Sequence, residues 1–231
     1  MRVNGRLARD PESPVHLGND RIEVDAKPLA AHEHVYLMLN KPRGIVTTAS
    51  DEKGRETVYD LFAGDLPWVA PVGRLDKASE GLLLLTNDSE WAGRVLAPDS
   101  HLDKTYHVHI DRIADQALLD SMLHGVQTAD AEVLRVKLVR LLRSGEKNSW
   151  LEVVLHEGRN RQIRRILDGL GVEVLRLVRI AVGPLRLGEL KKGATRQLTA
   201  TEKRAVDDAL QGSVRPPKRS PAKPKTHKEK P

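Results

Sequence analysis

An aspartate in a polar turn is the first candidate for chemistry in this sequence. Asp76 lies within V-G-R-L-D-K-A-S-E-G-L-L-L-L-T-N-D, residues 72–88, just before an apolar run that predicts a central strand. Such a turn can hold a carboxylate at the edge of a sheet, where it faces a cleft. The carboxylate could then act as a nucleophile, as a base or as the partner of a cation. The alternative is a turn aspartate that bonds its own backbone.

An arginine-rich segment is the second candidate. Residues 156–167, H-E-G-R-N-R-Q-I-R-R-I-L, contain four arginines within seven positions and no acidic residue among them. The apolar residues follow helical spacing, so one helix face packs on the core. Arg161 and Arg165 point away from that face, and Arg164 lies at its margin. This pattern predicts a site for phosphates or for one buried carboxylate, the alternative being a solvated helix face.

Two further segments carry weaker signals. Residues 102–110, L-D-K-T-Y-H-V-H-I, alternate as a strand, and Tyr106 could stack on a base, accept a proton or simply fill the core. His107 and His109 share the other strand face, but no carboxylate or third histidine lies near them in sequence, so a metal site is disfavoured. Residues 40–44, N-K-P-R-G, form a basic turn after a strand.

The elements that must position these residues are strands and helices without regular alternation. This mixture predicts an α+β fold with a mixed, largely antiparallel sheet and flanking helices. Strands are expected within 2–7, 20–25, 35–40, 81–86, 104–110, 132–142, 149–156 and 172–182, and helices over 56–63, 90–96, 114–123, 160–170 and 201–210.

Charge and composition narrow the functional class. The chain has 231 residues and a net charge of +6, but residues 213–231 hold seven of its 38 Lys and Arg and one of its 32 Asp and Glu. The rest is therefore neutral, so nucleic acid must be bound through a local patch. Aromatic residues are only 3%, too few for a multi-base stacking platform. Cysteine is absent and no apolar run approaches a membrane span, which predicts a cytoplasmic protein without membrane contact.

Five segments, taken in order, resemble the pseudouridine synthases that modify ribosomal RNA, in their RsuA-type branch. The segments are Y-L-M-L-N-K-P-R-G (36–44), V-G-R-L-D-K-A-S-E-G-L-L-L-L-T-N-D (72–88), K-T-Y-H-V (104–108), H-E-G-R-N-R-Q-I-R-R (156–165) and L-V-R-I-A-V-G-P-L-R-L-G-E-L-K-K-G-A-T-R-Q-L-T (177–199). The resemblance covers roughly residues 35–205. It implies an isomerase of the pseudouridine synthase fold that needs no metal or organic cofactor.

The resemblance also implies roles for individual residues. Asp76 matches the catalytic aspartate, Tyr106 the tyrosine that stacks on the target base, and Arg164 the arginine that pairs with the aspartate. Arg74 would hold the flipped nucleotide or fill the gap that it leaves. The residues expected to bind RNA phosphates are Lys41, Arg43, Arg159, Asn160, Arg161, Gln162 and Arg165.

The resemblance further divides the chain. Residues 1–34 match only the second half of an S4-like RNA-binding module, residues 35–210 form the catalytic domain, and residues 211–231 are a disordered basic tail. We expect the natural chain to begin upstream of Met1, which an intact mass would test. Residues 79–81, Ser-Glu-Gly, favour 23S over 16S ribosomal RNA as the partner, free or within an assembling subunit, and a monomer is expected.

Two rival functions stay open at the level of sequence. The first is a non-catalytic RNA-binding factor for ribosome assembly on the same scaffold, which Asp76→Asn would leave active. The second is a metal-dependent nuclease or hydrolase, which would need a cluster of carboxylates or histidines that the sequence does not offer.

Overall fold

The chain divides into two compact units. The computed structural model describes residues 1–10, 12–16, 19–28, 33–62 and 67–213. Contacts group Met1–His34 as one unit and Val35–Pro231 as the other. The helices among the described residues include none that is long and apolar enough to cross a membrane.

The first unit is a small antiparallel sheet. Its strands are β1 (Arg2–Val3), β2 (Arg6–Leu7), β3 (Ile22–Val24) and β4 (Lys27–Pro28), in the order β2-β1-β3-β4. Asn4 and Gly5 both have positive φ, 51° and 79°, as a tight hairpin turn between β1 and β2 requires. The two segments expected as short strands around turns are therefore confirmed, while their membership of an S4-like module stays a prediction.

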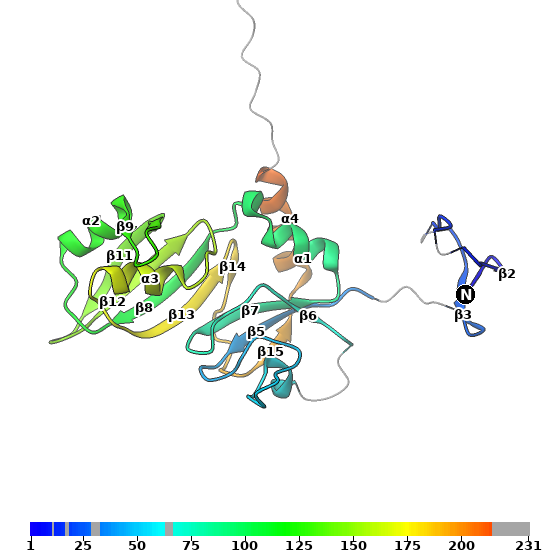
Figure 1. Ribbon diagram of the computed structural model, residues 1–231, viewed down its shortest axis with the longest axis horizontal. Helices are drawn as coiled ribbons and strands as arrows, with labels where there is room; N and C mark the ends of the chain where they lie inside the picture. Colours follow the sequence, from blue (N-terminus) through cyan, green and yellow to red (C-terminus); the bar gives the residue numbers. More distant parts are fainter. Residues whose placement is uncertain (11, 17–18, 29–32, 63–66, 214–231) are drawn as a thin grey trace, which may run out of the picture. The chain divides into compact units, whose positions relative to one another are not determined.

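The second unit is built on one large sheet (Figure 1). Its strands are β5 (Tyr36–Lys41), β6 (Ala70–Val72), β7 (Glu80–Thr86), β8 (Lys104–Ile110), β11 (Leu138–Ser144), β12 (Ser149–Leu155), β13 (Val174–Val182), β14 (Leu185–Arg186) and β15 (Thr195–Gln197). They are ordered β11-β12-β8-β13-β7-β5-β15, with β14 beside β13 and β6 beside β7. All pairs are antiparallel except β13–β7, which confirms a mixed, largely antiparallel sheet.

The parallel β7–β13 pair joins two halves of the sheet over only two residue pairs, Val178 with Glu80 and Arg179 with Gly81. Gly81 has a φ of +102°, and a Cβ there would lie 2.2 Å from the Arg179 carbonyl oxygen. Only glycine fits this approach, because any side chain would push the two strands apart. The loop that carries Asp76 leads directly into this junction.

The remaining elements are helices and one small hairpin. They are η1 (Val58–Leu61), α1 (Ser89–Leu96), η2 (Pro98–Ser100), α2 (Gln116–His124), α3 (Gln162–Gly169) and α4 (Ala200–Ser213), with the hairpin β9 (Val126–Gln127) and β10 (Val133–Leu134).

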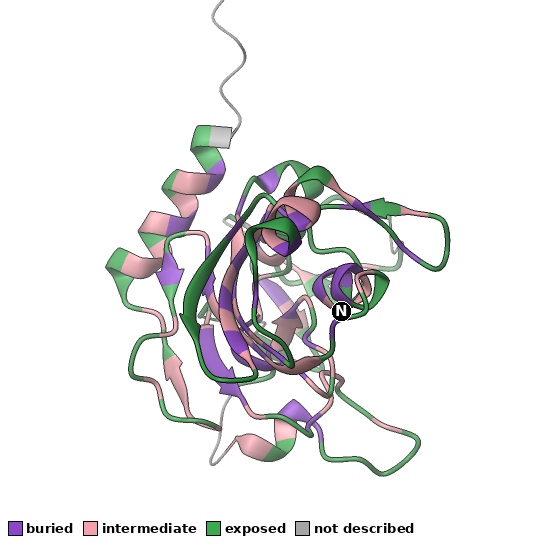
Figure 2. Cartoon of the chain, turned by 90° about the vertical axis from the view of Figure 1, so that its left-hand side faces the viewer, coloured by how far each residue is buried: buried purple, intermediate pink, exposed green. Residues whose placement is uncertain are grey.

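Three apolar clusters hold the sheet and helices together. One lies between α2, α3 and the strands β8, β12 and β13, and α3 lies over these strands in Figure 1. The second lies under α1 and α4, and the third on the opposite face of β5 and β7. Strand β7 is buried along its whole length, which explains its unbroken apolar run. Buried and partly buried residues alternate along β8 and β12, and Figure 2 colours the chain by burial.

Three expected elements differ most from the structure. The helix expected over 56–63 is the short 3-10 helix η1, closed at its start by a capping box of Thr57 and Asp60, and residue 63 lies outside the described residues. The strand expected over 132–142 is split into β10 and β11, because Val133 and Leu134 pair with β9 instead. Helix α4 continues to Ser213, past the expected end at residue 210, so residues 211–213 of the tail expected to be disordered are helical. The rest of that tail, 214–231, lies outside the described residues.

Candidate active site

The loop 75–79 is fixed to the preceding strand–turn segment through its backbone. Thr47 Oγ1 donates a hydrogen bond of 2.8 Å to the Leu75 carbonyl. The Gly44 N–H donates one of 2.8 Å to the Lys77 carbonyl. These bonds join the basic turn after β5 to the loop that carries Asp76, two segments about thirty positions apart in the sequence.

Lys41 secures the same loop from beneath. Its side chain is fully buried, and its Nζ donates to the carbonyls of Pro42, Asp76 and Ser79 over 3.1, 3.2 and 3.0 Å. Burial lowers the pKa of Lys41 to about 8, against the opposing influence of the Asp76 and Glu80 carboxylates. The prediction that Lys41 binds RNA phosphates is therefore corrected: its ammonium is buried and all three of its donors are used.

Arg164 completes the set of carbonyl contacts. Its Nη2 donates to the Ala78 carbonyl over 3.1 Å and its Nη1 to the Val174 carbonyl over 3.4 Å, while its buried Nε has no partner among the described residues. Burial and the charge of Arg161 lower the pKa of Arg164, whereas Asp76 raises it. Each carbonyl from Leu75 to Ser79 thus accepts a hydrogen bond, so the backbone of the loop is rigid.

The Asp76 carboxylate itself is left available. Its side chain is 33% exposed, and the nearest cation is Arg161, whose Nη1 lies 3.7 Å from Asp76 Oδ2. The direct ion pair is therefore with Arg161, while Arg164 meets the loop backbone. Arg161 caps α3 in the left-handed conformation, with a φ of 48° and no side-chain cap. A non-glycine residue in this conformation is uncommon and carries backbone strain.

Tyr106 approaches the same space from β8. It is 8% exposed, and the described residues give its hydroxyl no hydrogen-bond partner. Across the sheet it pairs with Arg179 of β13, whose Nε donates to the Leu82 carbonyl over 2.7 Å. Lys104 lies two residues before Tyr106 on the same strand face, and burial lowers its pKa. Tyr106 therefore stands among buried cations rather than alone in the core.

A cavity of about 740 Å³ brings these groups together. Asp76, Tyr106, Lys104, Arg179 and Arg161 all line it. Cavities of this size hold ligands as large as a nucleotide. Sequence reasoning missed Lys104 and Arg179. The position of Lys104, two residues before Tyr106 on the same strand, was a signal that could have found it. Arg179 belongs to the segment L-V-R-I, in which this arginine was given no role.

The other RNA-binding candidates are divided between the cavity and its surroundings. Arg74 and Asn160 are exposed and line the cavity, so both side chains are accessible to a substrate. Arg43 is exposed and donates to the Leu175 carbonyl over 3.4 Å. Whether these three side chains bind RNA stays a prediction.

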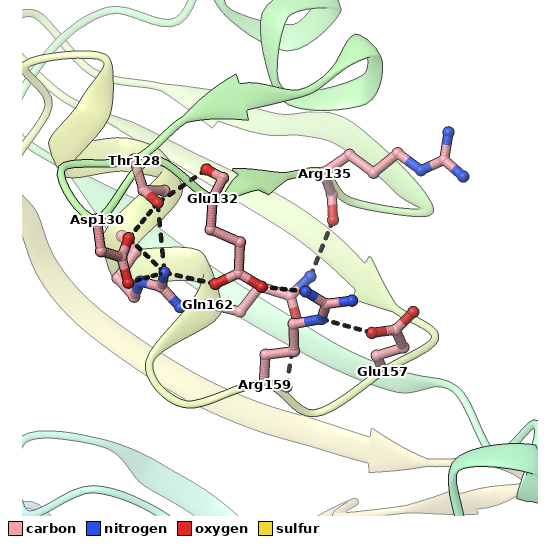
Figure 3. A network of polar contacts seen from close by, with 8 residues as sticks. Thr128, Asp130, Glu132, Arg135, Glu157, Arg159 and Gln162 are labelled. Carbon is pink, nitrogen blue, oxygen red and sulfur yellow. Dashed lines mark hydrogen bonds and ion pairs between the residues drawn. The ribbon is translucent and has the colours of Figure 1, made fainter.

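Arg159 is already held by carboxylates. It contacts Glu132 and donates to Glu157 over 2.7 Å, as the dashed lines in Figure 3 show. These ion pairs raise the pKa of Arg159. The positive charge of the four arginines is thus partly neutralised by carboxylates. One of these is Glu132 of the β9–β10 hairpin, about thirty residues earlier in the sequence.

Arg165 and Gln162 are both held by contacts within the protein, and Gln162 also lines the cavity. Arg165 Nη2 lies 2.5 Å from Asp130 and 2.6 Å from Glu132. Gln162 is buried, and its Nε2 donates to the Arg135 carbonyl over 3.0 Å (Figure 3). Its amide is buried and bonded to the backbone, and its role as an RNA contact stays a prediction.

The two strand histidines lie on the face opposite Tyr106. His109 stacks on Trp150 with ring centroids 4.7 Å apart, and His107 Nε2 lies 3.7 Å from Glu152. Within the described ranges, no three His, Asp or Glu side chains gather as metal ligands would.

The fold and the aspartate cavity define an RNA-modifying enzyme. Residues 35–168 match the family model described as RNA pseudouridylate synthase. The chain belongs to this family, and the resemblance seen in the sequence is confirmed.

Particular relatives agree with the family. The chain is 37% identical over 203 residues to "Ribosomal large subunit pseudouridine synthase B" of Bacillus subtilis (strain 168), which covers 87% of this chain and 83% of that protein. It is 38% identical over 203 residues to an uncharacterized RNA pseudouridine synthase of Aquifex aeolicus (strain VF5), covering 87% and 81%. A crystal structure of a pseudouridylate synthase superposes with a TM-score of 0.66 at 29% identity, covering 89% and 87%.

Proposed function

We propose that this enzyme converts a specific uridine of large-subunit ribosomal RNA to pseudouridine, with Asp76 as the catalytic residue. The name of the Bacillus subtilis relative supports this choice of RNA. The target base flips out of its stack into the cavity beside Asp76, because the reacting atoms are inaccessible within a duplex. The other candidate RNA, that of the small subunit, has no comparable support.

The reaction is an isomerisation, so its atoms balance within the nucleotide. The bond from the sugar C1′ to uracil N1 breaks, the base turns, and a new bond forms from C1′ to C5. A proton leaves C5 and N1 gains one. Asp76 acts at the sugar as nucleophile, as base or as partner of a cationic sugar, since one carboxylate suits each of these roles. Tyr106 offers its ring to the base, and its hydroxyl, which has no hydrogen-bond partner among the described residues, can accept the proton.

The observation that carries this proposal is the contrast between the Asp76 backbone and its carboxylate. Every carbonyl around it, from Leu75 to Ser79, is hydrogen-bonded, yet the nearest cation to the carboxylate is 3.7 Å away. A rigid backbone with an available side chain is the arrangement that preorganised catalysis requires. A turn aspartate with a purely structural role would instead spend its carboxylate on its own backbone.

The test is tritium release from large-subunit ribosomal RNA that carries 5-tritiated uridine. Wild-type enzyme should release tritium, and Asp76→Asn should lower the rate by at least about a thousandfold, because the amide cannot replace a carboxylate at the sugar. Mapping of pseudouridine in the product would then identify the uridine.

Three outcomes would overturn the proposal or part of it. Undiminished release by Asp76→Asn would remove Asp76 from catalysis. No release by wild type from naked RNA or from immature subunits, with RNA binding intact, would favour a ribosome-assembly factor. Tritium release from small-subunit RNA, with none from large-subunit RNA, would show that the small-subunit RNA is the substrate instead.

A further inference from the structure

A second cavity lies on the face of the sheet that the mechanism does not use. It measures about 430 Å³ and is lined by His107, Leu142, Arg143, Trp150, Arg176 and Val178. Its residues alternate along β8 and β13 with Tyr106 and Leu177, which line the catalytic cavity. Helices α2 and α3 pack on the Tyr106 side, so this cavity belongs to the opposite face.

Trp150, Arg143 and Arg176 of this lining belong to a layered stack of rings and guanidinium groups that also includes His109. Trp150 and His109 are parallel within 4°, with centroids 4.7 Å apart. The guanidinium carbons of Arg143 and Arg176 lie 5.2 and 5.9 Å from the centre of the Trp150 ring. Below, "the Trp150 patch" means His107, His109, Arg143, Trp150 and Arg176.

The charge of this face is uneven. Arg176 shares the buried Glu80 with Lys192, and Arg140 pairs with Glu152 at 2.8 Å. Arg143 is exposed and has no carboxylate within ion-pair distance among the described residues. Four cations thus face two carboxylates, which leaves a positive excess beside an aromatic surface. An anionic partner is favoured by this imbalance.

The stacked rings favour RNA over other anionic partners. Single-stranded nucleic acid presents flat bases that stack on aromatic rings and phosphates that pair with arginine. An acidic peptide would use the charges but would gain little from parallel Trp and His rings. Trp150 lies between His109 and Arg143, so the outer side of the stack is the part that meets a ligand. We propose that the Trp150 patch binds a single-stranded segment of the RNA substrate, with a base against the outer guanidinium plane of Arg143 and a phosphate at the same guanidinium.

This inference rests on the proposed function, because it names a second contact of the same RNA. Strands β8 and β13 each present one set of residues to the catalytic cavity and the alternate set to the patch. A long ribosomal RNA that reaches around the sheet would be held on both faces. Recognition would then depend on RNA outside the immediate surroundings of the modified uridine.

The experiment compares full-length Arg143→Ala, Trp150→Leu and wild type in filter binding to a large-subunit ribosomal RNA transcript over a series of salt concentrations. Arg204→Ala is the matched control, an exposed arginine on α4 outside both cavities. Both patch variants should weaken binding about three- to tenfold, and Arg143→Ala should lower the salt slope by about 1, as loss of one phosphate contact does. Thermal unfolding of Arg143→Ala, whose side chain is exposed, checks that the loss is not one of folding.

Equal affinity and salt slope in Arg143→Ala, Trp150→Leu and Arg204→Ala would overturn the inference. The patch would instead bind an acidic protein if two results came together. RNA binding would be unchanged in the patch variants, and polyglutamate would quench tryptophan fluorescence in a way that depends on Arg143. The tritium assay separates the two proposals. If wild type releases no tritium but its RNA binding needs Arg143, only the proposed function is wrong. If wild type releases tritium normally but its RNA binding does not depend on Arg143, only the inference about the Trp150 patch is wrong.

Discussion

At the scale of the residue, the buried ammonium of Lys41 helps to hold Asp76 in place. Three carbonyls share its ammonium, and two of them belong to the loop 75–79. Neutral lysine has only two donors, so loss of its proton must release one carbonyl. Leaving a buried acceptor unpaired costs about 1–3 kcal/mol.

The pH dependence of Lys41 follows from its pKa of about 8, lowered by burial from 10.5. Between these two values the unfolded chain binds more protons than the folded one, so the contribution of Lys41 to stability rises with pH. The free energy of unfolding of wild type relative to Lys41→Met should therefore increase by up to roughly 3 kcal/mol from pH 8 to 10.5. Urea denaturation of both proteins over this range measures it, and a flat difference would contradict the lowered pKa.

Arg164 should act on catalysis rather than on RNA affinity. Arg164→Lys cannot reach the Ala78 and Val174 carbonyls together, because lysine lacks the planar fork of donors. We expect kcat to fall about tenfold while the Kd for RNA stays within about twofold. Arg165→Lys is the matched control, since Arg165 lies one position further on the same helix but pairs with Asp130 and Glu132. Equal losses in both variants would show that the helix, not the loop contact, is at fault.

At the scale of the element, the junction of β7 and β13 depends on one glycine. Gly81→Ala would place a Cβ 2.2 Å from the Arg179 carbonyl at a φ of +102°, so we expect a loss of about 3 kcal/mol or more in unfolding free energy. Gly93→Ala, within α1, has nothing within 4 Å of the new Cβ and should stabilise by about 0.5–1 kcal/mol. Chemical denaturation of the two variants measures both effects; a mild Gly81→Ala would mean that the strands can separate without harm.

The β9–β10 hairpin pairs with part of the positive charge at and before the start of α3. Glu132 pairs with both Arg159 and Arg165, and these contacts hold the pKa of Glu132 below its ordinary value. Glu132→Gln should therefore tighten RNA binding about threefold at low salt and steepen its salt dependence, because a freed arginine can meet a phosphate. Glu146→Gln, an exposed residue of the β11–β12 turn, is the control. Weaker binding by Glu132→Gln would instead assign Glu132 to placing the arginines.

At the scale of the whole molecule, the apolar clusters lie almost entirely within the larger unit. All three clusters are formed by residues from Val35 onward, and Ile22 is the one buried apolar residue among the described residues of the smaller unit. A variant that lacks residues 1–33 should therefore keep the melting temperature of the main transition within a few degrees, while its RNA affinity falls. Calorimetry and filter binding of this variant test the division. A large drop in melting temperature would mean that the smaller unit supports the catalytic domain.

The sequence alone determined the class of the enzyme and much of its framework. The ordered segments around Asp76, Tyr106 and the arginine-rich helix were sufficient for the family, and period-two and helical patterns located most strands and helices. These signals are local, because capping residues, apolar alternation and turn residues act within a few positions of the chain.

Only the tertiary structure decided which charges meet. It buried Lys41 under the Asp76 loop, placed Arg161 next to the carboxylate, neutralised Arg159 and Arg165 with acids from the β9–β10 hairpin, and added Lys104 and Arg179 to the cavity. These partners lie tens of residues apart in sequence. Their pairing depends on strand order and on burial, which no local pattern of residues encodes.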